Sequence, residues 1–237
     1  HGSRGTHVLV TDSGERKRLE DQINFGLFFD RLTQLPNRTL LLDRISRALL
    51  GCQHEEHIGI LLVDVNRFRS INERFGHQFG DQLLVTWAGR LRKVLQPSDT
   101  LARIGVDDFA IVRSGSPGEG AMMALGRDVE ELARHPFRLP RETINLSATV
   151  GIALSEPGAT DAGALLQDGQ TALFKAKSGN RSSNRVLMFN RSMRAEVLGS
   201  HRLMNDLPQA IGRDELFLQY QPVVDIGEGR VVGLEAL

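Results

Sequence analysis

Two adjacent carboxylates, Asp107 and Asp108, lie between two short apolar stretches near the middle of the chain. Residues 100–102 and 109–112 are typical of buried strands, and Gly105 between them indicates a tight hairpin turn. A hairpin tip can present neighbouring carboxylates to a metal ion or a reacting hydroxyl group while the strands hold them in place. A solvated acidic turn is the alternative, and it is the better interpretation of this pair taken alone.

A third acid, Asp64, follows residues 58–63, a continuous apolar run of the kind found in a central strand. Because an unpaired buried carboxylate is costly, Asp64 must be paired, hydrogen-bonded or bound to a metal. Together with Asp107 and Asp108 it would form an oxygen-ligand site of the kind that Mg²⁺ prefers, with phosphate groups completing the coordination. The sequence therefore predicts a magnesium and phosphate site at the end of this strand.

Residues 70–81, which follow this strand, contain two short helical patterns joined at Gly76 and His77. Asn72 offers an amide and Asp81 a carboxylate, a pair suited to the Watson–Crick edge of guanine. The spacing does not establish that use, because Asn72 also suits an ordinary helix position and Asp81 an N-cap.

Regular elements must hold these residues, and the hydrophobic periodicity predicts where they lie. Residues 15–30 are expected to form a helix that either pairs with a second copy as a short coiled coil or packs on the domain, and Pro36 precedes a second helix. The other expected elements are a strand at 58–64, helices at 67–75 and 78–95, a hairpin at 100–112, a helix at 118–134, a strand at 143–154, a helix at 160–177, a strand at 185–189 and a helix at 190–213 interrupted near Gly199 and Pro208. This alternation predicts an α+β fold, with a mixed sheet and helices on its faces.

The composition is typical of a soluble cytoplasmic signalling domain. The 237 residues suffice for one well-buried domain with flanking segments. Lys and Arg number 29, as do Asp and Glu, so no overall basic field favours nucleic acid. The single cysteine, Cys52, excludes an internal disulfide and fits a reducing compartment. No apolar run approaches the roughly 20 residues of a membrane span, so any anchor would lie elsewhere in a longer protein.

Five groups of residues, spread along the chain, form a series. They are residues 30–38 (DRLTQLPNR), 64–72 (DVNRFRSIN), 75–81 (FGHQFGD), 103–109 (RIGVDDF) and 172–177 (ALFKAK). This series resembles the GGDEF domain, the diguanylate cyclase family of bacterial cyclic-di-GMP signalling. The resemblance covers about residues 25–190 and implies a nucleotide-cyclase-like fold with a mainly antiparallel central sheet and helices on both faces.

The resemblance also implies a reaction and a metal site. Two GTP molecules, each on one domain of an antiparallel pair, would exchange 3′-hydroxyl attacks on the α-phosphates and release pyrophosphate. Such phosphoryl chemistry needs metal ions, here Mg²⁺ or Mn²⁺, and an acid near the attacking hydroxyl. By resemblance, Asp64, the Val65 carbonyl and Asp107 would bind the metal, while Asp107 and Asp108 would be the catalytic acids.

The same resemblance assigns nucleotide-binding roles to five further residues. Asn72 and Asp81 match the guanine-reading pair, and Phe68 belongs to the nucleotide-binding set. Lys177 and Arg181, four residues apart on one helical face, match the pair that holds the terminal phosphates.

The signature departs from the family pattern Gly-Gly-Asp/Glu-Glu-Phe, since this chain has Gly105-Val106-Asp107-Asp108-Phe109. Valine avoids positive φ, and forcing it there costs on the order of 1–3 kcal/mol. Its side chain also lies on the ligand side of the turn, where a clash with ribose or phosphate would add to this cost. A resulting displacement of the reacting group can lower a rate about a hundredfold. Asp108 in place of Glu shortens the reach by one methylene. We therefore expect cyclase activity to be weak or absent.

A second departure concerns product inhibition. Family members often carry Arg-x-x-Asp before the signature, a pair that binds the cyclic dinucleotide product. Here Gln96 replaces the arginine while Asp99 remains, so the guanine-binding fork is lost. Product inhibition is therefore not expected at this position.

Both flanks resemble domains that accompany GGDEF domains. Residues 1–14 are interpreted as a tag remnant and the end of a PAS sensor domain, followed by a signalling helix at 15–30. The degenerate GGDEF domain is expected at 31–190, an interdomain helix at 191–213, and the first strands of a truncated EAL phosphodiesterase domain at 214–237. Glu235 matches a metal-binding glutamate of that domain. Covalently linked PAS and EAL domains are thus expected partners, beside GTP and a second copy of the chain.

Three functions remain open from the sequence. The leading hypothesis is a regulatory module that binds GTP and Mg²⁺ without efficient turnover and adjusts the downstream phosphodiesterase. The second is a slow but genuine diguanylate cyclase that tolerates Val106. The third is a nucleotide-free dimerisation or scaffold module that transmits signals through the helix at 15–30.

Overall fold

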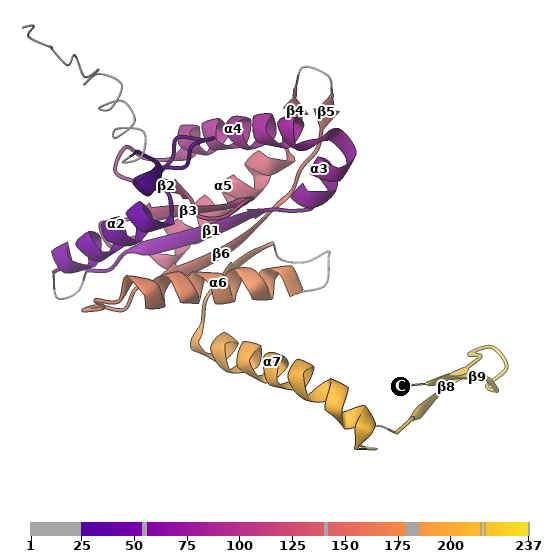
Figure 1. Cartoon of the computed structure of the whole chain (residues 1–237). Coiled ribbons are helices and arrows are strands. Elements are labelled where there is room, and N and C mark those ends of the chain that lie inside the picture. The colour runs from indigo at the N-terminus through magenta and orange to yellow at the C-terminus, as the bar shows by residue number, and fades with distance from the viewer. Residues whose placement is uncertain are drawn as a thin grey trace, which may run out of the picture. The chain divides into compact units, whose positions relative to one another are not determined.

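The computed structural model describes residues 25–53, 56–139, 142–178, 185–213, 215 and 217–236. Its central element is a five-stranded sheet with the strand order β2-β3-β1-β6-β7 (Figure 1). The strands are β1 (Gly59–Val65), β2 (Thr100–Arg103), β3 (Asp108–Arg113), β6 (Ala148–Leu154) and β7 (Val186–Met188). Neighbouring strands are antiparallel except β6 and β7, which pair in parallel. The predicted α+β fold with a mixed, mainly antiparallel sheet is confirmed.

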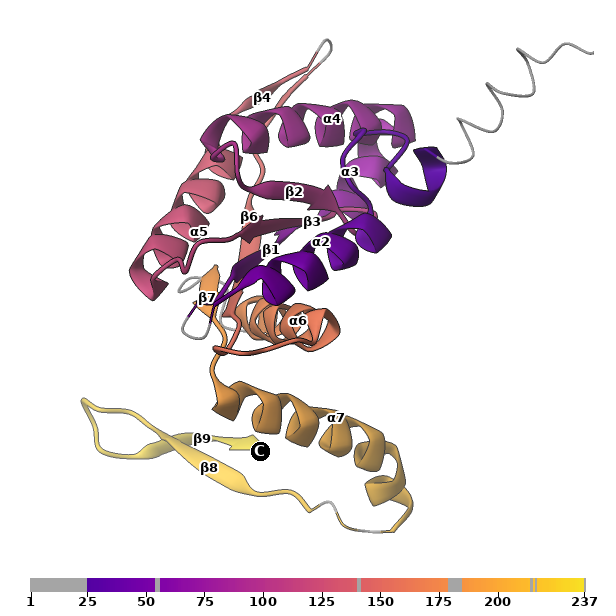
Figure 2. The same ribbon diagram turned by 90° about the vertical axis from the view of Figure 1, so that its left-hand side faces the viewer.

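Helices cover both faces of this sheet (Figures 1 and 2). One face carries α4 (His77–Val94) and α5 (Glu119–Arg134), and the other carries α2 (Arg38–Gly51) and α6 (Ala162–Ser178). Side chains of a strand alternate between faces. Accordingly, Leu61 and Val63 of β1 belong to the α4/α5 core, while Ile60 and Leu62 belong to the α2/α6 core. The sheet therefore has two separate apolar cores.

Helix α6 packs against β6 with no side chain between the two backbones. A Cβ atom on Gly151 would lie 2.3 Å from the Leu173 backbone nitrogen and 2.5 Å from the Gly169 carbonyl oxygen. Only glycine permits so close an approach of helix and strand. This contact sets the distance between β6 and the helix that carries Lys177.

The expected strand at 143–154 is wrong, because the structure divides it. β5 (Thr143–Ile144) forms a small hairpin with β4 (Phe137–Arg138), and β6 begins only at Ala148. The central strand β1 ends at Val65, which pairs with Ala148, so earlier residues have no ladder partner on that side. The alternation of side chains does not reveal where the partner strand stops.

The expected interruption of the helix at 190–213 is also wrong. Helix α7 (Arg191–Gly212) runs without a break through Gly199 and Pro208. A glycine costs a helix about 1 kcal/mol and an interior proline about 3 kcal/mol. The remaining backbone hydrogen bonds of this 22-residue helix offset these two local losses of stability.

At the N-terminal end, the structure describes only the last part of the expected helix at 15–30. Residues 25–28 are helical, and Phe29 already forms a bridge to Pro36. The helix thus ends two residues earlier than expected, and Asp30 belongs to the domain. The expected tag remnant and end of a PAS domain lie outside the described residues.

Contacts divide the chain into two units after Met193. The second unit contains the rest of α7 and a hairpin of β8 (Tyr220–Val224) and β9 (Val231–Ala236). Glu235 lies on β9, exposed, opposite Gln221. No described helix is long and apolar enough to cross a membrane.

The buried central strand allows a direct test of the fold. Leu62→Ala should lower the free energy of unfolding by about 2–5 kcal/mol, because Leu62 is 1% exposed in the α2/α6 core. The matched change Leu50→Ala, at a side chain 76% exposed, should alter it by about 0.5 kcal/mol or less. Urea denaturation measures both, and equal effects would contradict the assignment of this core.

Candidate functional site

Three carboxylates meet where β1 ends and β3 begins. Asp64 has the same side-chain parity as Ile60 and Leu62, and it therefore faces the α6 side of the sheet. The register of the two strands sets Asp64 directly opposite Asp108. Carboxylate oxygens of Asp64, Asp107 and Asp108 all lie within 4.8 Å of one another. The predicted cluster of acids is thus present, in a geometry that suits an oxygen-ligated cation.

One lysine partly balances this negative charge. Lys177 Nζ lies 2.5 Å from Asp64 Oδ2, although the two residues are 113 positions apart. The sequence suggests Lys177 as a phosphate ligand and gives no sign of this ion pair. The pair depends on the packing of α6 against the sheet, which side-chain periodicity does not predict.

The crowding of acids changes their protonation. Burial first, and then the charges of Asp64 and Asp107, raise the pKa of Asp108 to about 6. Burial and the charge of Asp64 likewise raise the pKa of Asp107, while Lys177 acts in the opposite direction. A bound cation would relieve this repulsion, as metal ions do at clustered carboxylates.

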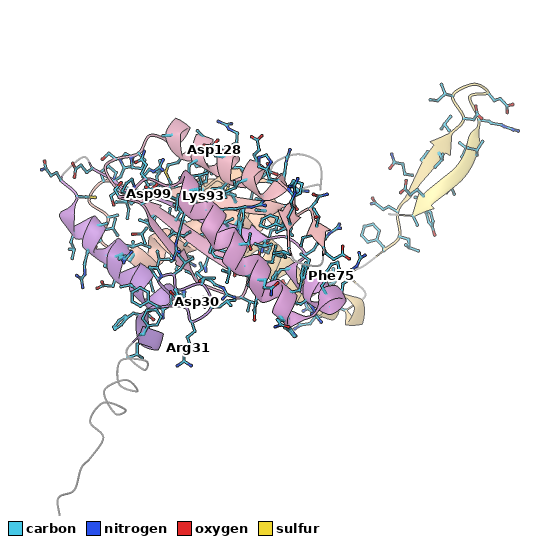
Figure 3. The ribbon with its side chains drawn as sticks, turned by 90° about the horizontal axis from the view of Figure 1, so that it is seen from above. Asp30, Arg31, Phe75, Lys93, Asp99 and Asp128 are labelled. Atoms are coloured by element: carbon cyan, nitrogen blue, oxygen red, sulfur yellow. The ribbon has the colours of Figure 1, made fainter. Side chains whose placement is uncertain are left out.

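Arg103 holds the signature turn in place. Its guanidinium donates to both carboxylate oxygens of Asp30 at 3.0 and 3.1 Å, and to the Val106 carbonyl at 2.6 Å. Asp30, labelled in Figure 3, also accepts hydrogen bonds from the backbone N–H and hydroxyl of Thr33. The turn at 105–107 is therefore connected to the segment that enters the domain.

The predicted backbone strain at Val106 is wrong. Among the described residues, positive φ occurs at Gln34, Arg67, Ser116 and several glycines, and neither Gly105 nor Val106 is one of them. The turn needs Gly105 for a different reason. A Cβ atom there would lie 2.5 Å from Asp108 Oδ2. Val106 itself is 68% exposed, so its effect is the space that its side chain occupies.

A cavity of about 440 Å³ adjoins the carboxylates, and Asn72, Val106 and Asp107 line part of it. Phe68, Arg69, Glu73 and His77 complete the lining. These residues come from the turn and from two consecutive helices, α3 (Phe68–Phe75) and α4. The predicted nucleotide residues Phe68 and Asn72 therefore lie beside the predicted metal site.

Asn72 has an unusual environment. Its Oδ1 is buried and has no hydrogen-bond partner within the described part of the chain. A Cβ atom on Gly80 would lie 1.9 Å from that oxygen, so glycine leaves the space in which the amide sits. Buried polar atoms without partners are rare and commonly mark ligand sites.

Asp81 does not share this cavity. Helix α4 begins at His77 after Gly76, so Asp81 is neither an N-cap nor a lining residue, and its side chain is exposed. Arg181, which was predicted to bind phosphate together with Lys177, lies outside the described residues. The roles of Asp81 and Arg181 remain predictions.

Asp99 is held by a partner that the sequence does not suggest. Arg113 donates to both of its carboxylate oxygens, at 2.9 and 2.6 Å, and the backbone N–H of Gln96 donates to Asp99 Oδ2. The Asp99 side chain is fully buried in this arrangement (labelled in Figure 3). The remaining acid of the product-binding pair is thus committed to Arg113.

The raised pKa of Asp108 predicts a measurable effect on stability. The pKa of the folded state, about 6, exceeds the ordinary value of 3.8, so stability falls as the pH rises between these values. Asp108→Asn removes that loss and should raise the free energy of unfolding by roughly 1–2 kcal/mol at pH 7.5 in EDTA. The two proteins should differ little near pH 4.

Urea denaturation at several pH values measures this difference. Asp128→Asn, at an exposed acid of α5, provides the matched control and should change stability little at either pH. A variant Asp108→Asn that is less stable than the original chain at pH 7.5 would contradict the electrostatic account.

Comparison with known proteins agrees with this fold and geometry. The family model described as "Diguanylate cyclase, GGDEF domain" matches residues 27–183. The GGDEF-only structure of TpbB (YfiN) from Pseudomonas aeruginosa is 34% identical, with a TM-score of 0.66, and covers 72% of this chain and 99% of that chain.

Longer relatives match nearly the whole chain. The bifunctional diguanylate cyclase/cyclic di-GMP phosphodiesterase MucR of Pseudomonas aeruginosa is 33% identical over 98% of this chain and 33% of that protein. The cyclic di-GMP phosphodiesterase PdeR of Escherichia coli is 31% identical over 96% of this chain and 34% of that protein. The chain spans about a third of the length of these curated relatives. On the family match over most of its length, the chain belongs to the GGDEF family, the diguanylate cyclase domains of cyclic-di-GMP signalling.

Proposed function

We propose that this domain binds GTP together with Mg²⁺ and serves mainly as a regulatory module, with slow turnover, in a larger cyclic-di-GMP signalling protein. One observation supports it above the others: the three clustered carboxylates adjoin the 440 Å³ cavity through Asp107, and Asn72, whose buried amide oxygen has no hydrogen-bond partner among the described residues, also lines this cavity. A cation site beside a pocket lined by an amide side chain suits a nucleotide.

The carboxylates fit a magnesium ion in both chemistry and charge. Asp64, Asp107 and Asp108 would hold the ion, and the Val65 carbonyl is the further ligand that the family resemblance implies. The ion would spread the negative charge of the phosphates during phosphoryl transfer. Lys177 would add a second positive charge on the α6 side, where it now pairs with Asp64.

Slow turnover follows in this proposal from the shape of the site. Val106 lines the 440 Å³ cavity beside Asp107, where the family pattern has a glycine without a side chain. Asp108 is one methylene shorter than the usual glutamate, so its carboxylate does not reach as far from the strand. Each change displaces or weakens a group that must be positioned closely for transfer.

A genuine cyclase is the second candidate, and the unstrained backbone of Val106 favours it. The turn does not require glycine at position 106, so valine there is compatible with the connection between β2 and β3. Relatives whose names include diguanylate cyclase carry matching domains. Two copies of the chain would then have to meet, since each would contribute one GTP.

The regulatory part of the proposal rests on the longer relatives. MucR and PdeR are named as phosphodiesterases, and this chain matches only about a third of each. We infer that PAS and EAL domains are linked to this domain, and that α7 transmits the effect of GTP binding to the EAL domain. Binding can act only by favouring one arrangement of the linked domains over another.

GTP binding tests the proposal directly. In calorimetry with Mg²⁺, the chain should bind GTP, and Asn72→Ala should weaken the affinity about tenfold or more because the guanine contact is lost. Gln78→Ala, on the exposed surface of α4, should bind like the original chain. Absence of GTP binding by the original chain would favour the scaffold function instead.

Turnover distinguishes the two enzymatic possibilities. If the Val106 side chain obstructs the site, Val106→Gly should form cyclic-di-GMP from GTP at least about tenfold faster. Asp107→Ala in the same background should abolish formation, which chromatography of the products would show. Equal rates for the original chain and the Val106→Gly variant would remove the steric explanation for slow turnover.

A further inference from the structure

The turn between β1 and α3 joins the carboxylates to the cavity beside them. β1 ends at Val65 and α3 begins at Phe68, so Asn66 and Arg67 form the whole connection. Asp64 lies two residues before Asn66, and α3 lines the 440 Å³ cavity on the other side of the turn. The conformation of these two residues therefore determines how the acid and the helix lie relative to each other.

The backbone of this turn is strained at Arg67. Its φ of 59° and ψ of 26° belong to the left-handed region, which residues with a Cβ atom rarely adopt. Such a conformation persists only where the surrounding structure holds it. Packing gives limited support here, because Asn66 and Arg67 also line a larger cavity of about 1370 Å³ and the Arg67 side chain is exposed.

The side chain of Asn66 supplies the missing support. Its Oδ1 accepts a hydrogen bond from the Thr149 hydroxyl at 2.9 Å, and its Nδ2 donates to the Ser147 hydroxyl at 3.0 Å. The backbone N–H of Asn66 also donates to the Ser147 carbonyl at 2.9 Å. We call these three hydrogen bonds the Asn66 clamp. Because Thr149 is only 3% exposed, the clamp fixes the turn to a buried part of β6.

The Asn66 clamp lies beside the clustered acids. Thr149 is directly opposite Asp64 in the pairing of β1 with β6, as Asp108 is in the pairing of β1 with β3. Opposed residues of paired strands have their side chains on the same face of the sheet. A hydroxyl group has one proton to donate, and Thr149 donates it to Asn66. The oxygens of Asp64 are thereby left to Lys177 and to a cation.

We propose that Asn66 is a positioning residue. It holds the β1–α3 turn in the conformation that places Asp64 and the Val65 carbonyl for a bound cation and Asn72 for a nucleotide. The inference rests on the proposed binding of GTP with Mg²⁺ and adds a residue that lies outside the predicted site. Polar groups that orient the ligands of a metal commonly change its affinity 10–100-fold when they are removed.

Titration of the whole chain with Mn²⁺ alone, followed by electron paramagnetic resonance of the free ion, measures the cation site without nucleotide. Asp64→Asn should lose most of this binding, which identifies the site. Asn66→Ala should weaken it about tenfold or more. Thr149→Val removes only the hydroxyl and should act in the same direction, also if Asn66→Ala does not fold. Thr86→Val, which removes a hydroxyl bonded to the Gln82 carbonyl within α4, should bind Mn²⁺ like the original chain.

Substitutions of Arg67 separate positioning from a general loss of stability. In the Asn66→Ala background, Arg67→Gly should recover affinity for Mn²⁺ roughly threefold or more, because glycine adopts the left-handed conformation without a Cβ penalty. Arg67→Ala removes the same side chain but keeps that penalty, and it should recover nothing. A merely structural role of Asn66 would lower the urea midpoint of Asn66→Ala without any change in Mn²⁺ affinity.

Calorimetry with GTP and Mg²⁺ distinguishes this inference from the proposed function. A chain that binds Mn²⁺ with the expected effects of the variants but does not bind GTP would contradict the proposed function and support the role of Asn66 at the cation. A chain that binds GTP with Mg²⁺, while Asn66→Ala binds both ligands equally well, would overturn the positioning role alone. Equal Mn²⁺ affinities of the glycine and alanine double variants would also overturn it, as would an original chain that does not bind Mn²⁺.

Discussion

The antiparallel register of β1 and β3 brings Asp64 opposite Asp108, and the rest of the site depends on this unfavourable pair of like charges. Directly opposed charges of one sign destabilise a sheet, and here a third carboxylate, Asp107, adds to them. The surrounding structure offsets this repulsion with a cation from α6 and with a raised proton affinity at Asp108. A bound cation would relieve this repulsion.

Local sequence patterns predicted much of this arrangement. The apolar run before Asp64 indicated a central strand, and two-residue periodicity then determines which face its side chain occupies. Contacts between distant elements were not predictable in the same way. The Lys177–Asp64 and Arg113–Asp99 pairs need the packing of α6 and the end of β3, and the start of β6 depends on where β1 stops. Glycine in the family pattern suggested a strained turn, but the backbone at Val106 is ordinary.

The signature turn is connected to two parts of the molecule at once. Arg103 joins its backbone at Val106 to Asp30, where the chain enters the domain, and Asp107 and Asp108 join it to the carboxylate cluster. Helix α3 has a comparable position, because its two faces line two cavities. Small elements of the domain thus contribute to more than one cavity or cluster at once.

Gly151 shows how indirectly a charge can be positioned. This residue bears no functional group, yet the absence of a side chain lets α6 pack on β6 at Leu173. Lys177 lies one turn further along the same helix, about 6 Å from that contact. The contact at Gly151 therefore determines where α6 places the Lys177 side chain. The charge beside Asp64 therefore depends on Gly151, a residue of the neighbouring strand β6 that is not one of the clustered acids.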